Sequence, residues 1–374
     1  MTLQIVELTR RFPGMRRPAV DHVTFSVDTG EIVALAGASG SGKTTTLRLI
    51  AGFDDPDGGS IYLGDRAVVS GRGALPPERR NIGVVFQEFA LFPHLTVFEN
   101  IAFGINKRAG VERSKRVEYL LSTAGISSLA ARYPHEISGG QQQRVAVARA
   151  LAPQPAILLL DEPFSNLDHT CTHRLLSETR SIIKENGAGA IVVSHDRYEA
   201  FTLADRIAVL NHGKIDQIGT AEEIFTTPRT REVAEFSGSV SWLPVWRTSD
   251  RWDSPLGPVP DDVAVVESNG SALASDRSAY AAVRPHQIAV GSARLEMHAI
   301  NAKETATSTG RRASVLETRF LGAVSAVRLA MNVCDSTGER DVELLAHLTA
   351  ASRPFRRGER VRVEWSSATG SGHR

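Results

Sequence analysis

Apolar runs alternate with polar and helical stretches from the start of the chain to about Phe236. Four short apolar runs predict buried strands, and they are Glu31–Ala36, Asn81–Phe86, Ala156–Leu160 and Ala190–Ser194. Several of these runs end at a polar cluster followed by a helical pattern, which is typical of a mostly parallel sheet flanked by helices. Because an open parallel sheet binds its ligands at the carboxyl edge of the strands, we expect the chemistry to lie there.

Between residues 88 and 150 the pattern becomes helical. Thr96 and Glu99 have the spacing of a capping box, and Val117 and Leu120 recur on one helical face. The sequence therefore predicts a helical insertion in the sheet domain.

After Phe236 short Val-rich and Ala-rich runs are separated by Gly, Ser and Pro, which predicts a small β barrel or sandwich. The predicted strands include Tyr280–Val283, Arg311–Arg319, Val324–Leu329 and Glu359–Trp365. Polar, small-residue stretches at residues 267–278 and 302–310 predict loops, and residues 366–374 are expected to be a disordered tail. The expected organisation is a first domain at residues 1–236 and a β domain at residues 237–374.

Length and composition agree with two globular domains, because 374 residues with 42% apolar and 23% charged residues can bury two cores. The net charge of +1 argues against a general nucleic-acid binder, which needs a strongly basic face. No run approaches the ~18 apolar residues that span a bilayer, and the first ten residues lack the apolar core of a secretory signal. With only two cysteines, the chain fits a reducing cytosol. We expect a protein that is soluble or peripheral to a membrane.

A glycine-rich segment connects the first of these predicted strands to the helical run Thr45–Ala51. It consists of Gly37, Ala38, Ser39, Gly40, Ser41, Gly42, Lys43 and Thr44, and Thr45 follows it. Its glycines allow backbone N–H groups to wrap around phosphates, and the helix start adds a partial charge of roughly +0.5. Lys43 is predicted to contact the β- and γ-phosphates of ATP, and Thr44 to ligate Mg²⁺. The alternative, a flexible Gly/Ser loop, does not account for the strand before the segment and the helix after it.

Polar residues at three other strand ends are candidates for the hydrolytic chemistry. Asp161 and Glu162 follow Ile157–Leu160, and we expect Asp161 to hold Mg²⁺ and Glu162 to polarise the attacking water. His195 is expected to form a hydrogen bond to the γ-phosphate and to orient the water, and Gln87 is expected to join the network around Mg²⁺ and the water. Taken singly, each has an ordinary alternative as a solvated polar residue at a strand end.

Two further places are predicted to contact nucleotide. Phe12 is predicted to stack on adenine, although an ordinary surface or core phenylalanine is the alternative. Ser138 stands at the N-cap of the predicted helix Gly139–Leu151, where its hydroxyl and the amides of Gly139 and Gly140 form a second anion site. One domain does not need two cradles for the γ-phosphate of one nucleotide.

Together these motifs resemble, in the same order, the ATPase subunit of ATP-binding cassette (ABC) transporters over residues 1 to about 236. The matching positions are Phe12, Gly37–Thr44, Gln87, Ile137–Gln141, Asp161–Glu162, Ser165–Asp168 and His195. Ile137 stands where the family usually has Leu, but the ligand groups come from Ser138 to Gln141. The resemblance implies that Asp168 belongs to the catalytic set and that ATP and Mg²⁺ are bound. It also implies a head-to-tail homodimer, in which each ATP lies between the phosphate loop of one copy and the signature segment, Ile137–Gln141, of the other.

The remainder resembles the accessory barrel of importer ATPases, the TOBE type, at Ala282–Val290, Arg319–Arg328 and Phe355–Trp365. A single cassette followed by such a barrel is similar to bacterial importers, whereas exporters usually fuse membrane spans to the ATPase. The implied fold is a P-loop NTPase, with an α/β RecA-like core and a helical subdomain, followed by a small all-β, OB-like domain. The implied partners are two membrane-spanning permease subunits and a periplasmic or lipid-anchored solute-binding protein, with no nucleic acid. The implied location is peripheral, on the cytoplasmic face of the inner membrane.

The segments Leu75–Arg80, Phe89–His94 and Asp161–Asp168 look most like ferric-ion importer ATPases. Sulfate or other oxyanion, polyamine and sugar importers share much of this pattern. Because other subunits select the cargo, the inference of ferric iron rests on resemblance and on no residue that would touch the cargo. The region after Gln87, including Phe89–Phe92, is a candidate surface for the membrane subunit, with helical-domain core as the alternative. Two other classes stay open, namely a soluble cassette ATPase of DNA repair or translation, and a module whose C-terminal domain binds a regulatory protein or a cargo-derived ligand.

Overall fold

The computed structural model describes residues 1–71, 73–105, 110–165, 169–267, 279–292, 311–321, 323–335, 338–349 and 355–366. These residues form two compact units, Met1–Ile224 and Phe225–Arg374. Apart from Glu267 and Ser366, the predicted loops at 267–278 and 302–310 and the predicted tail at 366–374 lie outside the described residues.

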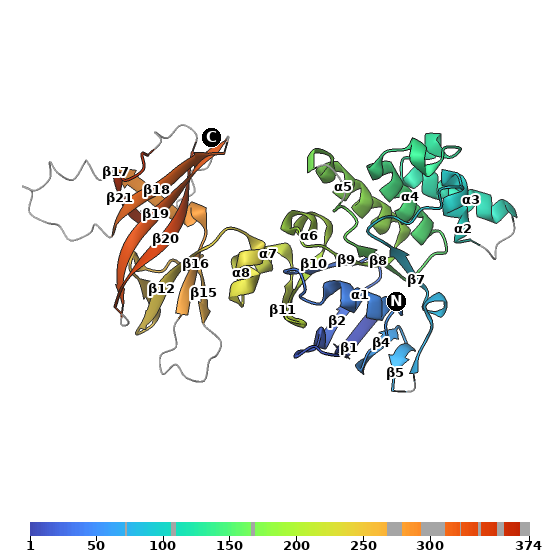
Figure 1. The fold of residues 1–374 in the computed structure, drawn as a ribbon, viewed down its shortest axis with the longest axis horizontal. Helices are drawn as coiled ribbons and strands as arrows, with labels where there is room; N and C mark the ends of the chain where they lie inside the picture. The colour runs from blue at the N-terminus through green and yellow to red at the C-terminus, as the bar shows by residue number, and fades with distance from the viewer. Residues whose placement is uncertain are drawn as a thin grey trace, which may run out of the picture. The chain divides into compact units, whose positions relative to one another are not determined.

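The first unit contains two sheets and most of the helices (Figure 1). Its elements in chain order are β1 (Leu3–Arg10), β2 (Val20–Val27), β3 (Ile32–Ala36), α1 (Lys43–Ala51), β4 (Gly58–Leu63), β5 (Arg66–Ser70), β6 (Gly73–Ala74), η1 (Pro77–Arg79), β7 (Ile82–Val85), α2 (Val97–Phe103), α3 (Gly110–Thr123), η2 (Ser127–Leu129), η3 (Pro134–Glu136), α4 (Gly139–Leu151), β8 (Ile157–Asp161), α5 (His169–Asn186), β9 (Gly189–Val193), α6 (Arg197–Leu203), β10 (Arg206–Asn211) and β11 (Lys214–Gly219). The helix α7 (Ala221–Thr226) follows.

The main sheet has six strands in the order β11-β10-β3-β9-β8-β7. The five strands from β10 to β7 run parallel, and β11 pairs antiparallel with β10. Every residue of β3 and β9 is buried, as expected for a parallel sheet that is covered on both faces. The four strands predicted in this region are confirmed to within one residue at each end, as β3, β7, β8 and β9.

A second, antiparallel sheet with the order β2-β1-β4-β5-β6 was not predicted from the sequence. One apolar core joins β1, β2, β4 and α1 to one face of the main sheet, so α1 packs between the two sheets. A second core joins the other face of the main sheet to α2, α3, α4, α5 and α6. Figure 1 shows α2–α4 on the side of the main sheet away from β1, β2 and β4.

The helical insertion is confirmed at residues 97–151, with its predicted start signals in place. Thr96 is the N-cap of α2, where its hydroxyl accepts from the Glu99 amide at 3.3 Å and the Glu99 carboxylate accepts from the Thr96 amide at 2.8 Å. Val117 and Leu120 are fully buried on α3, and α4 begins after Ser138 as predicted.

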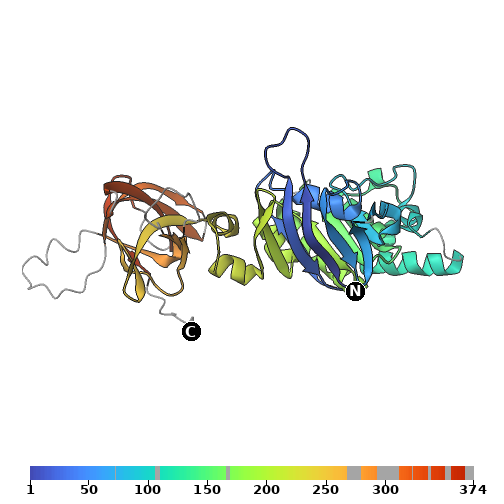
Figure 2. The same ribbon diagram turned by 90° about the horizontal axis from the view of Figure 1, so that it is seen from below.

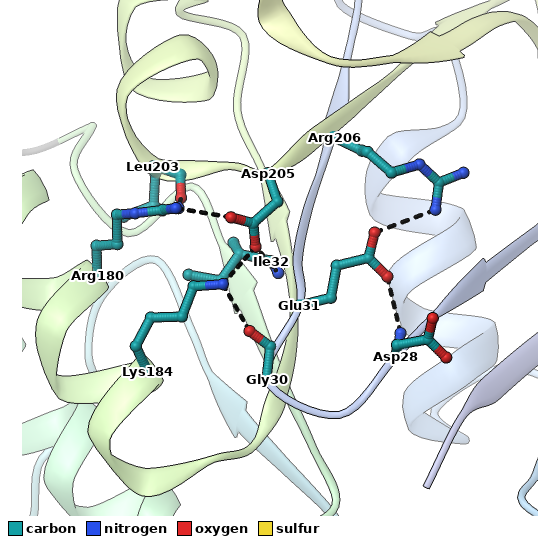
Figure 3. A network of polar contacts seen from close by, with 9 residues as sticks. All are labelled: Asp28, Gly30, Glu31, Ile32, Arg180, Lys184, Leu203, Asp205 and Arg206. Atoms are coloured by element: carbon teal, nitrogen blue, oxygen red, sulfur yellow. Dashed lines mark hydrogen bonds and ion pairs between the residues drawn. The ribbon is translucent and has the colours of Figure 1, made fainter.

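A polar network ties α5 and α6 to the starts of β3 and β10 (Figure 3). The Asp205 carboxylate accepts from Arg180 and Lys184, each at 2.6 Å, and from the Ile32 amide at 2.8 Å. Lys184 also donates to the carbonyl of Gly30, and Arg180 to that of Leu203. Burial alone would raise the pKa of Asp205, but the bonds that it accepts bring that pKa below its usual value. This network fixes the end of the main sheet opposite to the carboxyl ends of β3, β8 and β9.

The second unit begins at Phe225, near the end of α7, continues with α8 (Arg231–Ser237) and is otherwise almost entirely β structure. Its strands are β12 (Ser241–Thr248), β13 (Arg251–Ser254), β14 (Gly257–Pro258), β15 (Ala264–Glu267), β16 (Ala279–Val283), β17 (Ile288–Ser292), β18 (Arg311–Phe320), β19 (Val324–Asp335), β20 (Gly338–Thr349) and β21 (Arg360–Trp365), with a short turn of helix η4 (Pro285–Gln287). They form two five-stranded sheets, in the orders β14-β13-β12-β16-β15 and β17-β21-β18-β19-β20. Figure 2 shows the strands curling around a shared interior, where residues of both sheets form one apolar core. The predicted small all-β domain is confirmed.

Within this unit a buried arginine anchors the helical start to the strands. Arg284 donates to the carbonyls of Ala234 and Phe225, both at 3.1 Å, and to the Ser237 hydroxyl at 2.7 Å.

None of the helices in the described part of the chain is long and apolar enough to cross a bilayer.

Candidate functional site

The loop between β3 and α1 is pressed against neighbouring backbone, so glycine is required at two of its positions. Gly37 has φ of +134°, and a Cβ there would lie 2.2 Å from the carbonyl oxygen of Leu210. Gly42 has φ of +106°, and a Cβ there would lie 2.3 Å from the carbonyl oxygen of Ala19. The glycines of the predicted phosphate loop therefore serve close approach as well as backbone freedom.

Lys43 and the start of α1 give this loop its positive charge. The Lys43 ammonium donates to the carbonyls of Gly37 and Ala38, each at 2.9 Å. Burial lowers the pKa of Lys43, and the charges of Glu162 and Asp161 oppose that shift. The first-turn amides of a helix have no acceptor within the helix, so the start of α1 can receive an anion.

A cavity of about 280 Å³ lies over the phosphate loop. Its wall consists of loop and α1 residues together with Phe12, Met15, Ala19 and Glu162. Phe12 is partly exposed, and the Arg10 guanidinium lies 5.0 Å from the centre of its ring. Sequence reasoning missed Met15 and Ala19, because only the folding of the β1–β2 connection onto the loop brings them there.

Two oxygen-bearing side chains meet beside the loop. The Thr44 hydroxyl donates to Oδ1 of Asp161 at 3.4 Å. Burial raises the pKa of Asp161, and the neighbouring charge of Glu162 raises it further, so a cation would stabilise the ionised form. Mg²⁺ is usually held by one or two protein oxygens together with substrate phosphates, and this pair fits that pattern.

Glu162 is the point on which three strand ends converge. Nδ1 of His195, which follows β9, lies 3.4 Å from the Glu162 carboxylate. Gln87, which follows β7, donates through Nε2 to the Ser165 hydroxyl at 3.2 Å, and that hydroxyl donates to the Glu162 carbonyl at 3.0 Å. Glu162 itself has φ of +43°, unusual for a residue with a side chain. Asp168, the remaining predicted catalytic residue, lies outside the described residues.

A buried carboxylate beside His195 was not predicted. Glu199 on α6 is 9% exposed and accepts from the Ser194 hydroxyl at 2.5 Å, while that hydroxyl accepts from the Asp196 amide at 3.0 Å. Burial raises the pKa of Glu199. These bonds fix the backbone on both sides of His195. The sequence signal was only an acid in the first turn of a short helix, which usually stays in solvent.

The signature segment lies apart from this cavity. The backbone amide of Ser138 donates to Oε1 of Gln141 at 2.9 Å, and Ser138 and Gly139 are exposed. Gly140 lies against α5, where a Cβ would meet the Leu175 side chain at 2.9 Å. Among the described residues that line the cavity over the phosphate loop, none belongs to the signature segment. The chain thus brings the loop, Asp161, Glu162, Gln87 and His195 together, but not Ser138–Gln141.

The region after Gln87 divides between core and surface. Phe89 is 6% exposed and belongs to the core that includes α2–α4. The Phe92 ring packs on Phe103 with centroids 4.4 Å apart, and Phe103 is 48% exposed.

Comparison with known proteins identifies the family. A family model described as ABC transporter matches residues 20–165. The sulfate/thiosulfate import ATP-binding protein CysA of Caulobacter vibrioides is 40% identical over 346 residues, which cover 87% of this chain and 97% of that protein. The Fe(3+) ions import ATP-binding protein FbpC of Haemophilus influenzae is 47% identical over 224 residues, which cover 59% of this chain and 64% of that protein.

A solved structure agrees with the fold of the first unit. The ATP-binding cassette MJ0796, solved as a dimer in a post-hydrolysis state with ADP and Pi, is 32% identical with a TM-score of 0.50. The match covers 58% of this chain and 98% of that one. The predicted phosphate-loop ATPase fold and the predicted family are confirmed, and the chain belongs to the ATPase family of ABC transporters.

Proposed function

We propose that this chain is the ATP-hydrolysing subunit of a bacterial import complex. The observation that carries the proposal is the convergence of His195 and the Gln87–Ser165 pair on Glu162, beside a phosphate loop with an open cavity. An acid with a histidine beside its carboxylate and a polar network on its backbone carbonyl, at the edge of a nucleotide site, can activate water for attack on a phosphate. Both relatives described above are named as import ATP-binding proteins.

Each group has a proposed role. Lys43 and the loop amides from Gly37 to Thr45 bind the phosphates, and Phe12 stacks on the base. Thr44 and Asp161, with Gln87, would hold Mg²⁺, which supplies positive charge at the phosphate oxygens when bound. Glu162 accepts a proton from the attacking water, and His195 orients that water.

The separation of the signature segment from the cavity supports a homodimer. Ser138 to Gln141 offer a helix N-terminus and a hydroxyl, and these groups line no part of the cavity in their own chain. A second copy, arranged head to tail, would supply them to the nucleotide on the facing phosphate loop. The solved cassette is itself a dimer. Asp168 joins this paired site by the family resemblance alone.

The proposed division of labour follows the predicted domains. Residues 1–236 form the cassette, and residues 237–374 form the TOBE-like accessory barrel. In the proposed complex, two permease subunits and a solute-binding protein work with this chain, which lies at the cytoplasmic face of the membrane. Phe92 and Phe103 are the proposed contact for a permease, because they offer an apolar patch on the helical insertion beside the turn that follows Gln87.

Two cargoes remain as proposals. The motif resemblance favours ferric iron, whereas the relative that matches over nearly its whole length is named for sulfate and thiosulfate import. No residue of this chain need touch either solute. Measuring which solute stimulates ATP hydrolysis in the reconstituted complex separates the two.

The test of the proposed function is the variant Glu162→Gln, which keeps the shape of the side chain but cannot accept a proton. We expect it to bind Mg·ATP like the wild type and to hydrolyse it at least ~100-fold more slowly. Phosphate release and binding of a fluorescent ATP analogue are the two measurements. Near wild-type turnover would show that Glu162 is not the base.

A further inference from the structure

The turn that follows Gln87 has an unusual backbone. Phe89 and Ala90 both have left-handed conformations, with φ of +60° and +46°, although neither is glycine. Residues with side chains are disfavoured in this region and remain there only where surrounding contacts hold them. Two such residues in succession require an explanation.

Arg149, near the end of α4, holds both of them. Its Nη1 donates to the Ala90 carbonyl and its Nη2 to the Phe89 carbonyl, each at 2.7 Å. Its guanidinium also lies 5.6 Å from the centre of the Phe92 ring. Within the described residues no ion pair of Arg149 with a carboxylate is found, and burial lowers its pKa. The charge is therefore directed at backbone carbonyls rather than at an acid.

The two ends of this contact lead to the two halves of the proposed ATP site. The turn begins two residues after Gln87, whose side chain is linked through the Ser165 hydroxyl to the backbone carbonyl of Glu162. The helix that carries Arg149 begins directly after Ser138 and runs for 13 residues, or roughly 20 Å. One helix thus connects the signature segment to the turn beside Gln87.

We propose that Arg149 is a positioning residue for ATP hydrolysis, which fixes the Phe89–Ala90 turn and so keeps Gln87 in register with the helix that starts at the signature segment. It touches no nucleotide and acts only through Gln87. This inference rests on the proposed ATPase function.

The test is Arg149→Met in the full-length chain, with steady-state hydrolysis of Mg·ATP as the measurement. Because two charge-assisted hydrogen bonds to the turn are lost, we expect kcat to fall about 10-fold. KM should change less than about twofold, since the phosphate loop keeps its contacts. Adding Ala90→Gly should restore most of kcat, because glycine adopts positive φ without a steric cost. The kcat of Arg149→Lys should lie between those of Arg149→Met and the wild type.

Arg144→Met is the matched control, because Arg144 lies on the same helix but donates to the Ala124 carbonyl at 3.1 Å and pairs with Glu178 at 3.5 Å. It should lower the melting temperature yet keep the kcat of the folded protein, and Ala90→Gly should not alter that result.

Three results would overturn the inference. They are a wild-type kcat in Arg149→Met, a loss of kcat that Ala90→Gly does not recover, and an equal loss in Arg144→Met. If Arg149→Met does not fold, the kcat of Arg149→Lys is compared with that of Arg149→Lys combined with Ala90→Gly. A wild-type kcat in both variants would overturn the inference. The proposed ATPase function is tested separately. If the wild type hydrolyses ATP and Glu162→Gln does not, that function stands whatever the Arg149 variants show, whereas an inactive wild type would refute it.

Discussion

The starts of α1 and α4 are both suited to bind an anion, yet they are built differently. The start of α1 follows a loop with glycines at positive φ, is covered by a cavity and has Lys43 beside it. The start of α4 is capped by the side chain of Gln141 on the Ser138 amide, is exposed and lines no part of the cavity over the phosphate loop. The difference agrees with the proposal that the start of α1 is one half of the ATP site and that the start of α4 serves a second copy of the chain.

The comparison also separates two uses of glycine. Gly37 and Gly42 have conformations and neighbours that exclude any side chain. Gly140 has no positive φ, and the atoms nearest to a Cβ there belong to the Leu175 side chain rather than to backbone. Close backbone therefore requires glycine in the phosphate loop, whereas at Gly140 a side chain is the nearest neighbour.

The largest expected effect tests whether the second half-site serves another copy. Ser138→Arg should leave nucleotide binding at the phosphate loop intact and lower turnover at least ~100-fold, because the long side chain blocks the paired surface. Binding of an ATP analogue and phosphate release distinguish the two effects.

Mixing the Ser138→Arg variant with a phosphate-loop variant provides the control. Lys43→Ala and Ser138→Arg should each be inactive alone, but in a head-to-tail dimer their random mixture leaves one intact site in half of the dimers. Activity should then return to about a quarter of the wild type if the sites work independently. No recovery at any ratio would argue against a composite site.

The next effect concerns the fixed loop. Gly37→Ala should lower the free energy of unfolding by more than ~3 kcal/mol, because the new methyl group meets the Leu210 carbonyl and the φ is unfavourable. Gly30→Ala is the matched control, with φ of +73° and no atom within 4 Å of a Cβ, and should cost only ~1 kcal/mol. Urea unfolding of both variants gives the difference, and equal losses would mean that close approach does not constrain the loop.

The smallest effect concerns the aromatic wall of the first half-site. Phe12→Ala should raise KM for ATP about 10-fold with little change in kcat, since stacking on a base is worth ~1–3 kcal/mol. Phe12→Tyr should retain the wild-type KM. A KM that is the same in all three proteins would make Phe12 an ordinary surface residue held by Arg10.

The sequence predicted four of the six strands of the main sheet, because these strands are continuous apolar runs between polar residues, as in β8 and β9, whereas β10 and β11 were not predicted. It did not predict the antiparallel sheet, since β1 and β4 mix polar and apolar residues and pair across the chain, with Leu3 opposite Leu63. Their register also shifts between Val6 and Thr9, which breaks any simple alternation.

The site was predictable where a motif states the backbone geometry, as the phosphate loop does. The hydrogen bonds from Arg149 to the carbonyls of Phe89 and Ala90 were not predictable, because they join residues about 60 positions apart. The turn also contains no glycine, the usual sequence sign of a positive φ. The burial of Glu199 depends in the same way on tertiary packing that a short helical pattern does not reveal.

The position of β3 in the main sheet sets the order in which the molecule can assemble during synthesis. β3 ends at residue 36, but both of its neighbours, β9 and β10, come after residue 188. Until the ribosome has released about that length of chain, the strand before the phosphate loop has no partner on either edge. Such long-range parallel pairing is slow. Nucleotide can therefore stabilise the first unit only late in folding, when nearly all of it has already been made.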